Sequence, residues 1–527
     1  MIAQYFTYRN LYILGFSALF FCLPVSVYVL SISQFFLGLI WLVERDYIQK
    51  LKRVAGNKYF WLFALLYLLH IVSLLYTSNF GDALDELRIK LPLLLVPFFF
   101  ASIPKLSTKE YKIIAGFFIL GLIISIGASY YLYYVEKDNL AFDPRNASRF
   151  VSHIRLSLML ALGSIMLGYE AITTRQNWAY KSALLIIAMV FLAYMISLKM
   201  LTGIVVFIIA LFIILELHLF SQNRKLFKLV ALVLPIAISA LIGLYVYSFV
   251  KTFIFPNVVD YSERVERSAN GGKYDYHPEI LQLENGNRVW DFLSEYEMEI
   301  AWDKRSEIKY KEKELTGQPI RVTLIRFLTS KNIRKDRYGV EALSEDEIEA
   351  IENGVTNYRF MTNKGLSKRI YETAWELHNY LVNKDNPSGN SVAQRIEFWK
   401  AAKHVINKNW LIGVGAGDLK DELNLAYTES NSVLNEKYRS KPHNQYITFF
   451  VYFGFIGLVW FLIVLLQSYE ALKKDIVGVS FFIIVTLSMI TEDTLETQIG
   501  ASFFIAFMGL YTIGLRHEDV PSAEIRD

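Results

Sequence analysis

One polar stretch of the chain joins a histidine to the start of a long apolar segment. Residues 442–446 read Pro-His-Asn-Gln-Tyr, and an apolar pattern long enough to cross a bilayer continues to Leu466. We expect a membrane helix to begin at His443, directly after the proline. The positive end of a helix dipole disfavours imidazolium, so a histidine there stays neutral and can accept a proton, and the same end attracts phosphate. This junction therefore offers a candidate base and anion site, although helix starts also take histidine as an ordinary cap.

Basic residues elsewhere could bind phosphate. Arg395 lies in the segment 391–399, where its guanidinium could bind phosphate through two hydrogen bonds or simply lie on an exposed helix face. Arg155 and Lys199 are expected at the outer ends of membrane spans, at the depth of a lipid-linked diphosphate. Ordinary extension of long basic side chains toward the headgroups explains their positions equally well.

Other polar groups complete the set of candidates. Asn444 and Gln445, directly after His443, are predicted to bind substrate. The glycine-rich segment 413–417 could cradle phosphate or form a plain turn after a helix. Acidic residues at 492, 493 and 496 could cap a helix end, orient His443 or contact an acceptor sugar.

The composition is that of a membrane protein. Hydrophobic residues make up 54% of the 527 residues, and the mean hydropathy is +0.31. Cys22 is the only cysteine, so the chain can form no internal disulfide and no thiolate metal site. We expect no cofactor and no metal. The region 251–441 is close to neutral and carries no block of basic charge, so we expect no nucleic acid partner.

Apolar runs predict an all-α polytopic membrane protein with about twelve transmembrane helices. Pro24 divides the first long run, 11–43, into two short helices. The remaining spans are expected at about 58–76, 91–104, 113–135, 154–170, 182–198, 201–220, 229–249, 444–467, 477–491 and 500–515.

The distribution of lysine and arginine predicts the orientation. With the N-terminus inside, the inner segments hold about 18 basic residues and the short outer segments about 6. Both chain ends are then cytoplasmic, and the long insertion is extracytoplasmic. We divide the chain into a membrane domain with about nine helices, a large mostly helical extracytoplasmic domain, about three C-terminal helices and a cytoplasmic tail, at 1–250, 251–442, 443–515 and 516–527.

Local signals predict helices within the insertion. Ser344 and Glu347 have the spacing of a capping box, which opens a helix that ends near Gly354. An amphipathic helix is expected over 366–382, and another over 391–407 after a Pro- and Gly-containing break.

The segment 391–457 resembles a known family. His443 and Asn444, followed after nine residues by Gly454 and Gly457, resemble the histidine signature of the O-antigen ligases, within a superfamily that also holds O-antigen polymerases and protein O-oligosaccharyltransferases. The upstream segments 395–399 and 413–417 are similar to the stretch that precedes this histidine in the family. About twelve spans with a large outer loop before the last few helices also fit.

The resemblance implies a metal-independent glycosyl transfer at the periplasmic face of the bacterial inner membrane. The donor would be a glycan linked to undecaprenyl diphosphate, and the acceptor a hydroxyl of lipid A–core or a related glycan. His443 would then activate the acceptor hydroxyl, and Arg395 would hold the diphosphate. Family members commonly carry a second essential arginine in a Ser-Arg pair, where this chain has Ser197, Leu198 and Lys199. Either Lys199 or Arg155 is the expected replacement.

Two alternative functions remain. A polymerase of the same superfamily would use similar residues to lengthen the lipid-linked chain. A transporter or flippase would place charged residues near the middle of spans and relate two halves of the chain by a repeat. The sequence has no such repeat, and its polar candidates gather at the outer ends of spans, which argues against a transporter.

Overall fold

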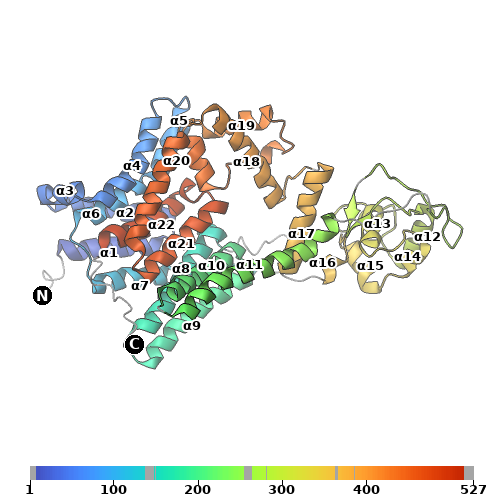
Figure 1. The fold of residues 1–527 in the computed structure, drawn as a ribbon, viewed down its shortest axis with the longest axis horizontal. Coiled ribbons are helices and arrows are strands. Elements are labelled where there is room, and N and C mark those ends of the chain that lie inside the picture. The colour runs from blue at the N-terminus through green and yellow to red at the C-terminus, as the bar shows by residue number, and fades with distance from the viewer. Residues whose placement is uncertain are drawn as a thin grey trace. The chain divides into compact units, whose positions relative to one another are not determined.

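The computed structural model describes residues 7–136, 148, 150–222, 224–254, 264–280, 282–362, 366–384 and 386–515. The predicted cytoplasmic tail, 516–527, lies outside these residues. The described chain is mostly helical and contains one two-stranded hairpin (Figure 1). This composition agrees with the predicted all-α membrane class.

The chain forms two compact units. The first comprises residues 1–227, 397–432 and 439–527. Its helices are α1 (Tyr8–Cys22), α2 (Val27–Val43), α3 (Tyr47–Ala55), α4 (Lys58–Ser73), α5 (Phe80–Lys90), α6 (Pro92–Ser102), α7 (Thr108–Glu136), α8 (His153–Thr173), α9 (Trp178–Ser197), α10 (Leu201–Ser221), α19 (Leu419–Glu429), α20 (Gln445–Leu472), α21 (Ile476–Thr491) and α22 (Gln498–Gly509), with short turns η6 (Thr494–Glu496) and η7 (Leu510–Gly514).

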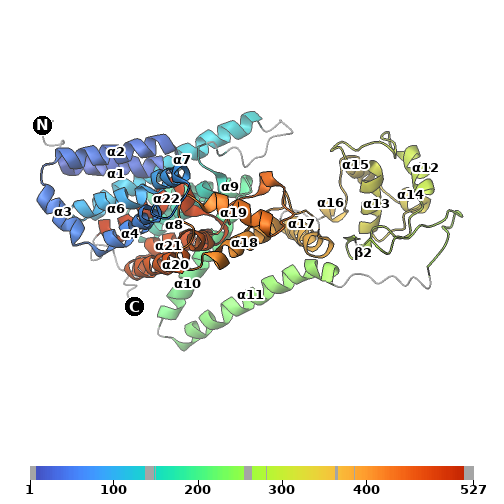
Figure 2. The same ribbon diagram turned by 90° about the horizontal axis from the view of Figure 1, so that it is seen from above.

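Helix α8 is the most buried of the long helices in this unit. It packs against α9, α10 and α21, and thirteen of its residues are buried. Small residues allow the close approach: a Cβ on Gly203 of α10 would lie 2.4 Å from the Cβ of Ser157. Helix α1 packs against both α2 and α7, and Figure 2 shows α1 and α2 side by side.

Six helices in the described residues are long and apolar enough to cross a membrane: α7, α8, α9, α10, α11 (Lys225–Ile254) and α20. A seventh span arises if the bent pair α3 and α4 is one span. Other predicted spans form shorter apolar helices, such as the 17 residues of α2 and the 16 of α21. The expectation of about twelve spans therefore stays a prediction.

Helix α20 is bent at one glycine. Gly454 has a φ of 61° and a ψ of −160°, a conformation that only glycine adopts readily. The residues after α18 (Ser391–Lys408) pass close to this bend, and a Cβ on Gly454 would lie 2.2 Å from the carbonyl carbon of Leu411. The glycine thus allows α20 and the backbone at Leu411 to pack in close contact.

The second unit comprises residues 228–396 and 433–438. It contains most of α11, the first turn and a half of α18, and the 3-10 turn η5 (Glu436–Tyr438). Between them lie α12 (Glu295–Arg305), α13 (Ile320–Ser330), α14 (Arg337–Glu341), α15 (Glu345–Glu352), α16 (Arg359–Thr362), α17 (Leu366–His378) with its π-helical end η4 (Asn379–Asn383), and the strands β1 (Leu283–Glu284) and β2 (Asn287–Arg288).

Local sequence explains several of these elements. Asn285 and Gly286 join the strands with φ values of 52° and 84°, the two positive values that a tight hairpin turn needs. The capping box of Ser344 and Glu347 is present at the start of α15, as predicted. Helices α17 and α18 likewise match the two predicted helices. Trp302, Leu324 and Phe327 are fully buried in a core shared by α12, α13 and α15.

Candidate active site before helix α20

A buried carboxylate fixes the backbone just before α20. His443 has a φ of 50°, in the left-handed region that few residues other than glycine adopt. Asp493, after the end of α21, accepts a hydrogen bond from the His443 N–H at 2.9 Å and one from the Asn444 N–H at 3.0 Å. It also accepts a hydrogen bond from the Thr448 hydroxyl at 2.7 Å. The helix therefore begins at Gln445, after its cap Asn444, and not at His443 as we predicted.

The imidazole of His443 is half-buried beside α18. Its Nε2 lies 3.2 Å from the hydroxyl oxygen of Ser440, and its ring centroid lies 5.6 Å from that of Phe398. Trp399 donates its indole N–H to the carbonyl of Pro442 at 3.0 Å. The aromatic pair at 398 and 399 thus positions the histidine segment, which connects two sequence motifs that lie more than forty residues apart.

Asn444 and Gln445 both bind parts of the protein. The Asn444 side chain accepts the N–H of Ile447 at 3.0 Å and donates to the carbonyl of Ile490 at 2.9 Å. Gln445 accepts the N–H of Leu495 at 2.6 Å through its side-chain oxygen. Both are buried, and these amides join α20 to the end of α21 and to the connection that follows it. Their predicted contact with substrate stays a prediction.

A cluster of charged residues lies beside the histidine segment. Lys441 Nζ lies 2.9 Å from Glu86 Oε1 and 2.7 Å from Glu496 Oε2. Lys90 Nζ pairs with Glu86 and lies 3.2 Å from Glu496 Oε1. The Tyr452 hydroxyl donates to Glu496 at 2.7 Å. We call these five residues the charged cluster; its two ammonium groups balance its two carboxylates, as burial of charge requires.

Arg155 and Lys199 lie at the same end of the first unit. Arg155, in the first turn of α8, donates to the hydroxyl of Ser152 at 3.0 Å and lies near the carboxylates of Glu492 and Asp493. It lines a cavity of only about 10 Å³, which holds at most one water molecule. Lys199 is exposed at the turn between α9 and α10, with a φ of 53°.

The glycine-rich segment 413–417 packs against the protein through its backbone. The N–H groups of Val414 and Gly415 donate to the carbonyls of Val451 and Tyr452, at the bend of α20. The next two N–H groups, at 416 and 417, donate to the hydroxyls of Ser73 and Thr77 at 3.1 and 3.2 Å. Because these donors already have protein acceptors, the segment is a structural turn and not a phosphate cradle.

Arg395 belongs to the second unit, because the division between the units falls within α18, after Ile396. It precedes Trp399 by one helical turn. Its role with diphosphate stays a prediction. Among the described residues, no three His, Cys, Asp or Glu side chains gather in a way that could hold a metal ion.

The comparisons agree with the resemblance in the sequence. Residues 346–462 match a family model described as O-antigen ligase. The matched stretch, 117 of the 527 residues, is similar to an O-antigen ligase domain. None of the curated proteins in the comparison matches the chain. The match supports membership of the superfamily of O-antigen ligases and polymerases, whose activity is glycosyl transfer.

The residues that match the O-antigen ligase model include only part of the candidate site. Arg395, His443, Gly454 and Gly457 lie inside the matched residues, whereas Asp493 and most of the charged cluster lie outside them. Sequence reasoning missed Glu86, Lys90 and Lys441. The i, i+4 spacing of Glu86 and Lys90 in the charged stretch between two apolar runs was the available signal, but only the folded chain brings this pair to Lys441.

Burial and neighbouring charges set the protonation of this site. Burial, together with the charge of Glu496, raises the pKa of the Asp493 carboxyl to about 6, although hydrogen bonds from Thr448 and His443 oppose the change. Burial alone would raise the pKa of Glu496, but the ammonium groups of Lys90 and Lys441 outweigh it and hold this pKa below its ordinary value. Glu496 is therefore ionised at neutral pH, while Asp493 titrates close to neutral pH.

Proposed function

We propose that this protein transfers a glycan from an undecaprenyl diphosphate carrier to an acceptor hydroxyl, such as one of lipid A–core, at the periplasmic face of the bacterial inner membrane. The observation that supports this most is the placement of His443: it lies within the residues that match the O-antigen ligase model, and the Asp493 carboxylate holds its backbone. The apolar spans and the basic residues at their ends support a membrane-bound, lipid-linked donor.

The proposed reaction is a displacement at the anomeric carbon of the donor sugar. The acceptor oxygen forms a bond to this carbon as the bond to the diphosphate oxygen breaks, and undecaprenyl diphosphate leaves with the electron pair. His443 accepts the proton of the acceptor hydroxyl. The contact between its Nε2 and the Ser440 hydroxyl has the geometry that such an acceptor would need.

The other residues have supporting roles in this proposal. Arg395 binds the diphosphate, because a guanidinium fork fits its oxygens and stabilises the charge that develops as the bond breaks. Arg155 and Lys199 are the candidates for a second cation at the same membrane surface. Asp493 is a positioning residue: it fixes the backbone of His443 and does not contact the substrate. Asn444 and Gln445 would bind substrate only through side-chain amide atoms that are not already hydrogen-bonded to the protein.

Reconstituted transfer tests the proposal. Proteoliposomes containing the purified protein receive the undecaprenyl-diphosphate glycan and lipid A–core, and the glycosylated acceptor is measured. We expect His443→Ala to lower transfer by about 10²- to 10⁴-fold, the usual contribution of a general base. His404→Ala is the matched control, since His404 lies on α18 and pairs with Glu429 at a partly exposed surface. Transfer by His443→Ala at the wild-type rate would rule out the proposed base.

A second arm separates ligase from polymerase. The same proteoliposomes receive lipid-linked repeat units without lipid A–core, and the length of the lipid-linked chain is measured. The ligase proposal predicts no lengthening. Growth of the chain without an added acceptor would make the protein a polymerase.

A further inference from the structure

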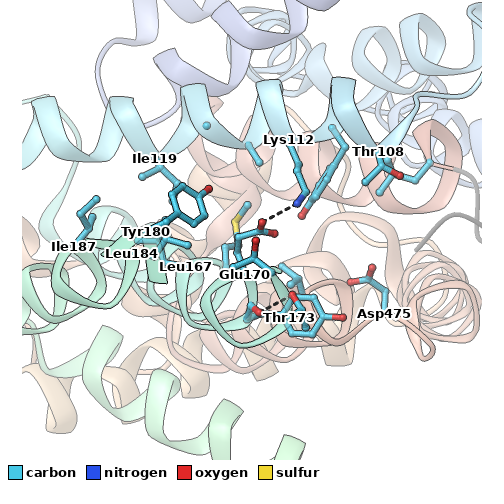
Figure 3. Close-up of a pocket in the computed structure, with 18 of the residues that line it drawn as sticks. Thr108, Lys112, Ile119, Leu167, Glu170, Thr173, Tyr180, Leu184, Ile187 and Asp475 are labelled. Carbon is cyan, nitrogen blue, oxygen red and sulfur yellow. Dashed lines mark hydrogen bonds and ion pairs between the residues drawn. The ribbon is translucent and has the colours of Figure 1, made fainter. Parts of the chain in front are cut away.

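The first unit contains a cavity that the proposed reaction does not use. It has a volume of about 330 Å³, within the range of small-molecule sites, and it lies between α7, α8 and α9 beside the start of α21 (Figure 3). Gly116 of α7 lines it, and no heavy atom lies within 4 Å of the place where a Cβ of Gly116 would be. The space is therefore open beside the helix backbone.

The cavity has an apolar part and a charged part. Ile119, Leu167, Leu184 and Ile187 line the apolar part. The charged lining residues are Lys112, Glu170 and Asp475, and Lys112 Nζ lies 2.7 Å from Glu170 Oε1, as the dashed line in Figure 3 marks. Such a lining fits a molecule with a polar head and an apolar chain.

This cavity is distant from the candidate active site. Arg155 and Glu170 lie near opposite ends of α8, and their separation of fifteen positions corresponds to about 22 Å of helix. Most lining residues come from the beginning of α7, the end of α8 and the beginning of α9, all of which are candidate spans, and Asp475 comes from the cap of α21. The cavity thus opens at the ends of membrane helices, away from His443.

We propose that this cavity binds a membrane phospholipid with a primary amine in its head group, such as phosphatidylethanolamine. The lining carries one ammonium and two carboxylates, so a phosphate can pair with Lys112 while the amine donates to Glu170 and Asp475. An anionic head group without an amine would bring no donor to these carboxylates, which now bond to Lys112 and to the Gly478 N–H. The quaternary ammonium of phosphatidylcholine has no N–H to donate. One acyl chain lies along the apolar wall.

Native mass spectrometry of the purified protein, after exchange into mixed micelles with equal phosphatidylethanolamine, phosphatidylcholine and phosphatidylglycerol, tests this. We expect the wild type to retain phosphatidylethanolamine in preference to the other two. Gly116→Leu fills the cavity and should lose the bound lipid. Gly127→Leu is the matched control, because Gly127 is an exposed glycine of the same helix with open space around it and does not line the cavity.

A second variant keeps the test valid if Gly116→Leu does not fold. Glu170→Gln removes one carboxylate and leaves the apolar wall intact, so lipid should remain bound but without the preference for phosphatidylethanolamine over phosphatidylcholine. Equal retention of phosphatidylethanolamine by the wild type and Gly116→Leu would overturn the proposal. Preference of the wild type for phosphatidylglycerol, equal binding of all three lipids, or binding of detergent alone would do the same.

Discussion

The segments 413–417 and 440–444 are both held through backbone N–H groups, but by different acceptors. The N–H groups of Val414 to Gly417 meet neutral carbonyls and hydroxyls, and glycine permits their close approach. In 440–444, the N–H groups of His443 and Asn444 meet one buried carboxylate, beside a cluster of four further charges.

This contrast separates a packing contact from a positioning contact. Neutral hydrogen bonds hold a turn without burying charge, whereas a buried carboxylate requires desolvation and needs full compensation. Of these two segments, only the one that carries the candidate base has this requirement. The two segments should therefore respond differently to mutation and to pH.

Removal of one charge from the cluster should have the largest effect on stability. Lys441→Met leaves the carboxylates of Glu86 and Glu496 with only Lys90, and an uncompensated buried charge costs about 3–5 kcal/mol. We expect a large fall in the thermal unfolding temperature of the protein in detergent. The double variant Lys441→Met/Glu86→Gln restores neutrality and should recover part of the loss. If the double variant is no more stable than the single one, charge balance does not hold this cluster.

The bend of α20, which accepts the N–H groups of the neutral segment, should respond to the loss of a glycine. Gly454→Ala forces a Cβ against the backbone of Leu411 and requires a φ of 61° with a ψ of −160°. The backbone conformation alone costs about 1–3 kcal/mol, so the unfolding temperature should fall. Gly127→Ala, where a Cβ meets open space, is the control and should leave that temperature unchanged or higher. Equal behaviour of the two variants would contradict the close packing at the bend.

The smallest expected effect is a pH dependence that only the charged segment produces. Asp493 has a pKa near 6 in the folded protein and an ordinary value of 3.8, so the folded state binds a proton between these values where the unfolded state does not. Through this group, stability rises as the pH falls through 6. As the pH falls from 7.5 to 5, the unfolding temperature of the wild type should thus rise relative to that of Asp493→Asn. A constant difference would show that Asp493 does not titrate in this range.

The sequence predicts the elements whose signals are local. The capping box of Ser344 and Glu347 and the helix α18 were both visible in short windows. The candidate base His443 and its neighbour Asn444 were also identified from residue type and position, although the cap lies one residue later than the predicted helix start.

Contacts between distant residues were not predictable in the same way. Orientation of His443 was one of three roles that the sequence allowed for the acidic residues at 492, 493 and 496, and the structure assigns it to Asp493. No periodic pattern could select this residue, which lies fifty residues after His443, or Glu86, which lies more than three hundred and fifty residues before Lys441. The left-handed backbone of His443 and the bend at Gly454 also depend on tertiary contacts, because local preference favours a regular helix start and a straight span. The cavity at Gly116 arises only when three helices pack.

Graded substitution of Asp493 tests most directly whether a buried carboxylate positions the base. The rate of glycan transfer is measured in proteoliposomes for the wild type, Asp493→Asn and Asp493→Ala, together with the KM for the lipid-linked donor. Alanine removes both acceptors of the His443 and Asn444 N–H groups, so we predict a fall in kcat of about 10²-fold, the size expected for a misplaced catalytic group, with KM little changed. Asparagine keeps one acceptor oxygen and should give an intermediate rate. Wild-type kcat in a folded Asp493→Ala protein would contradict the account.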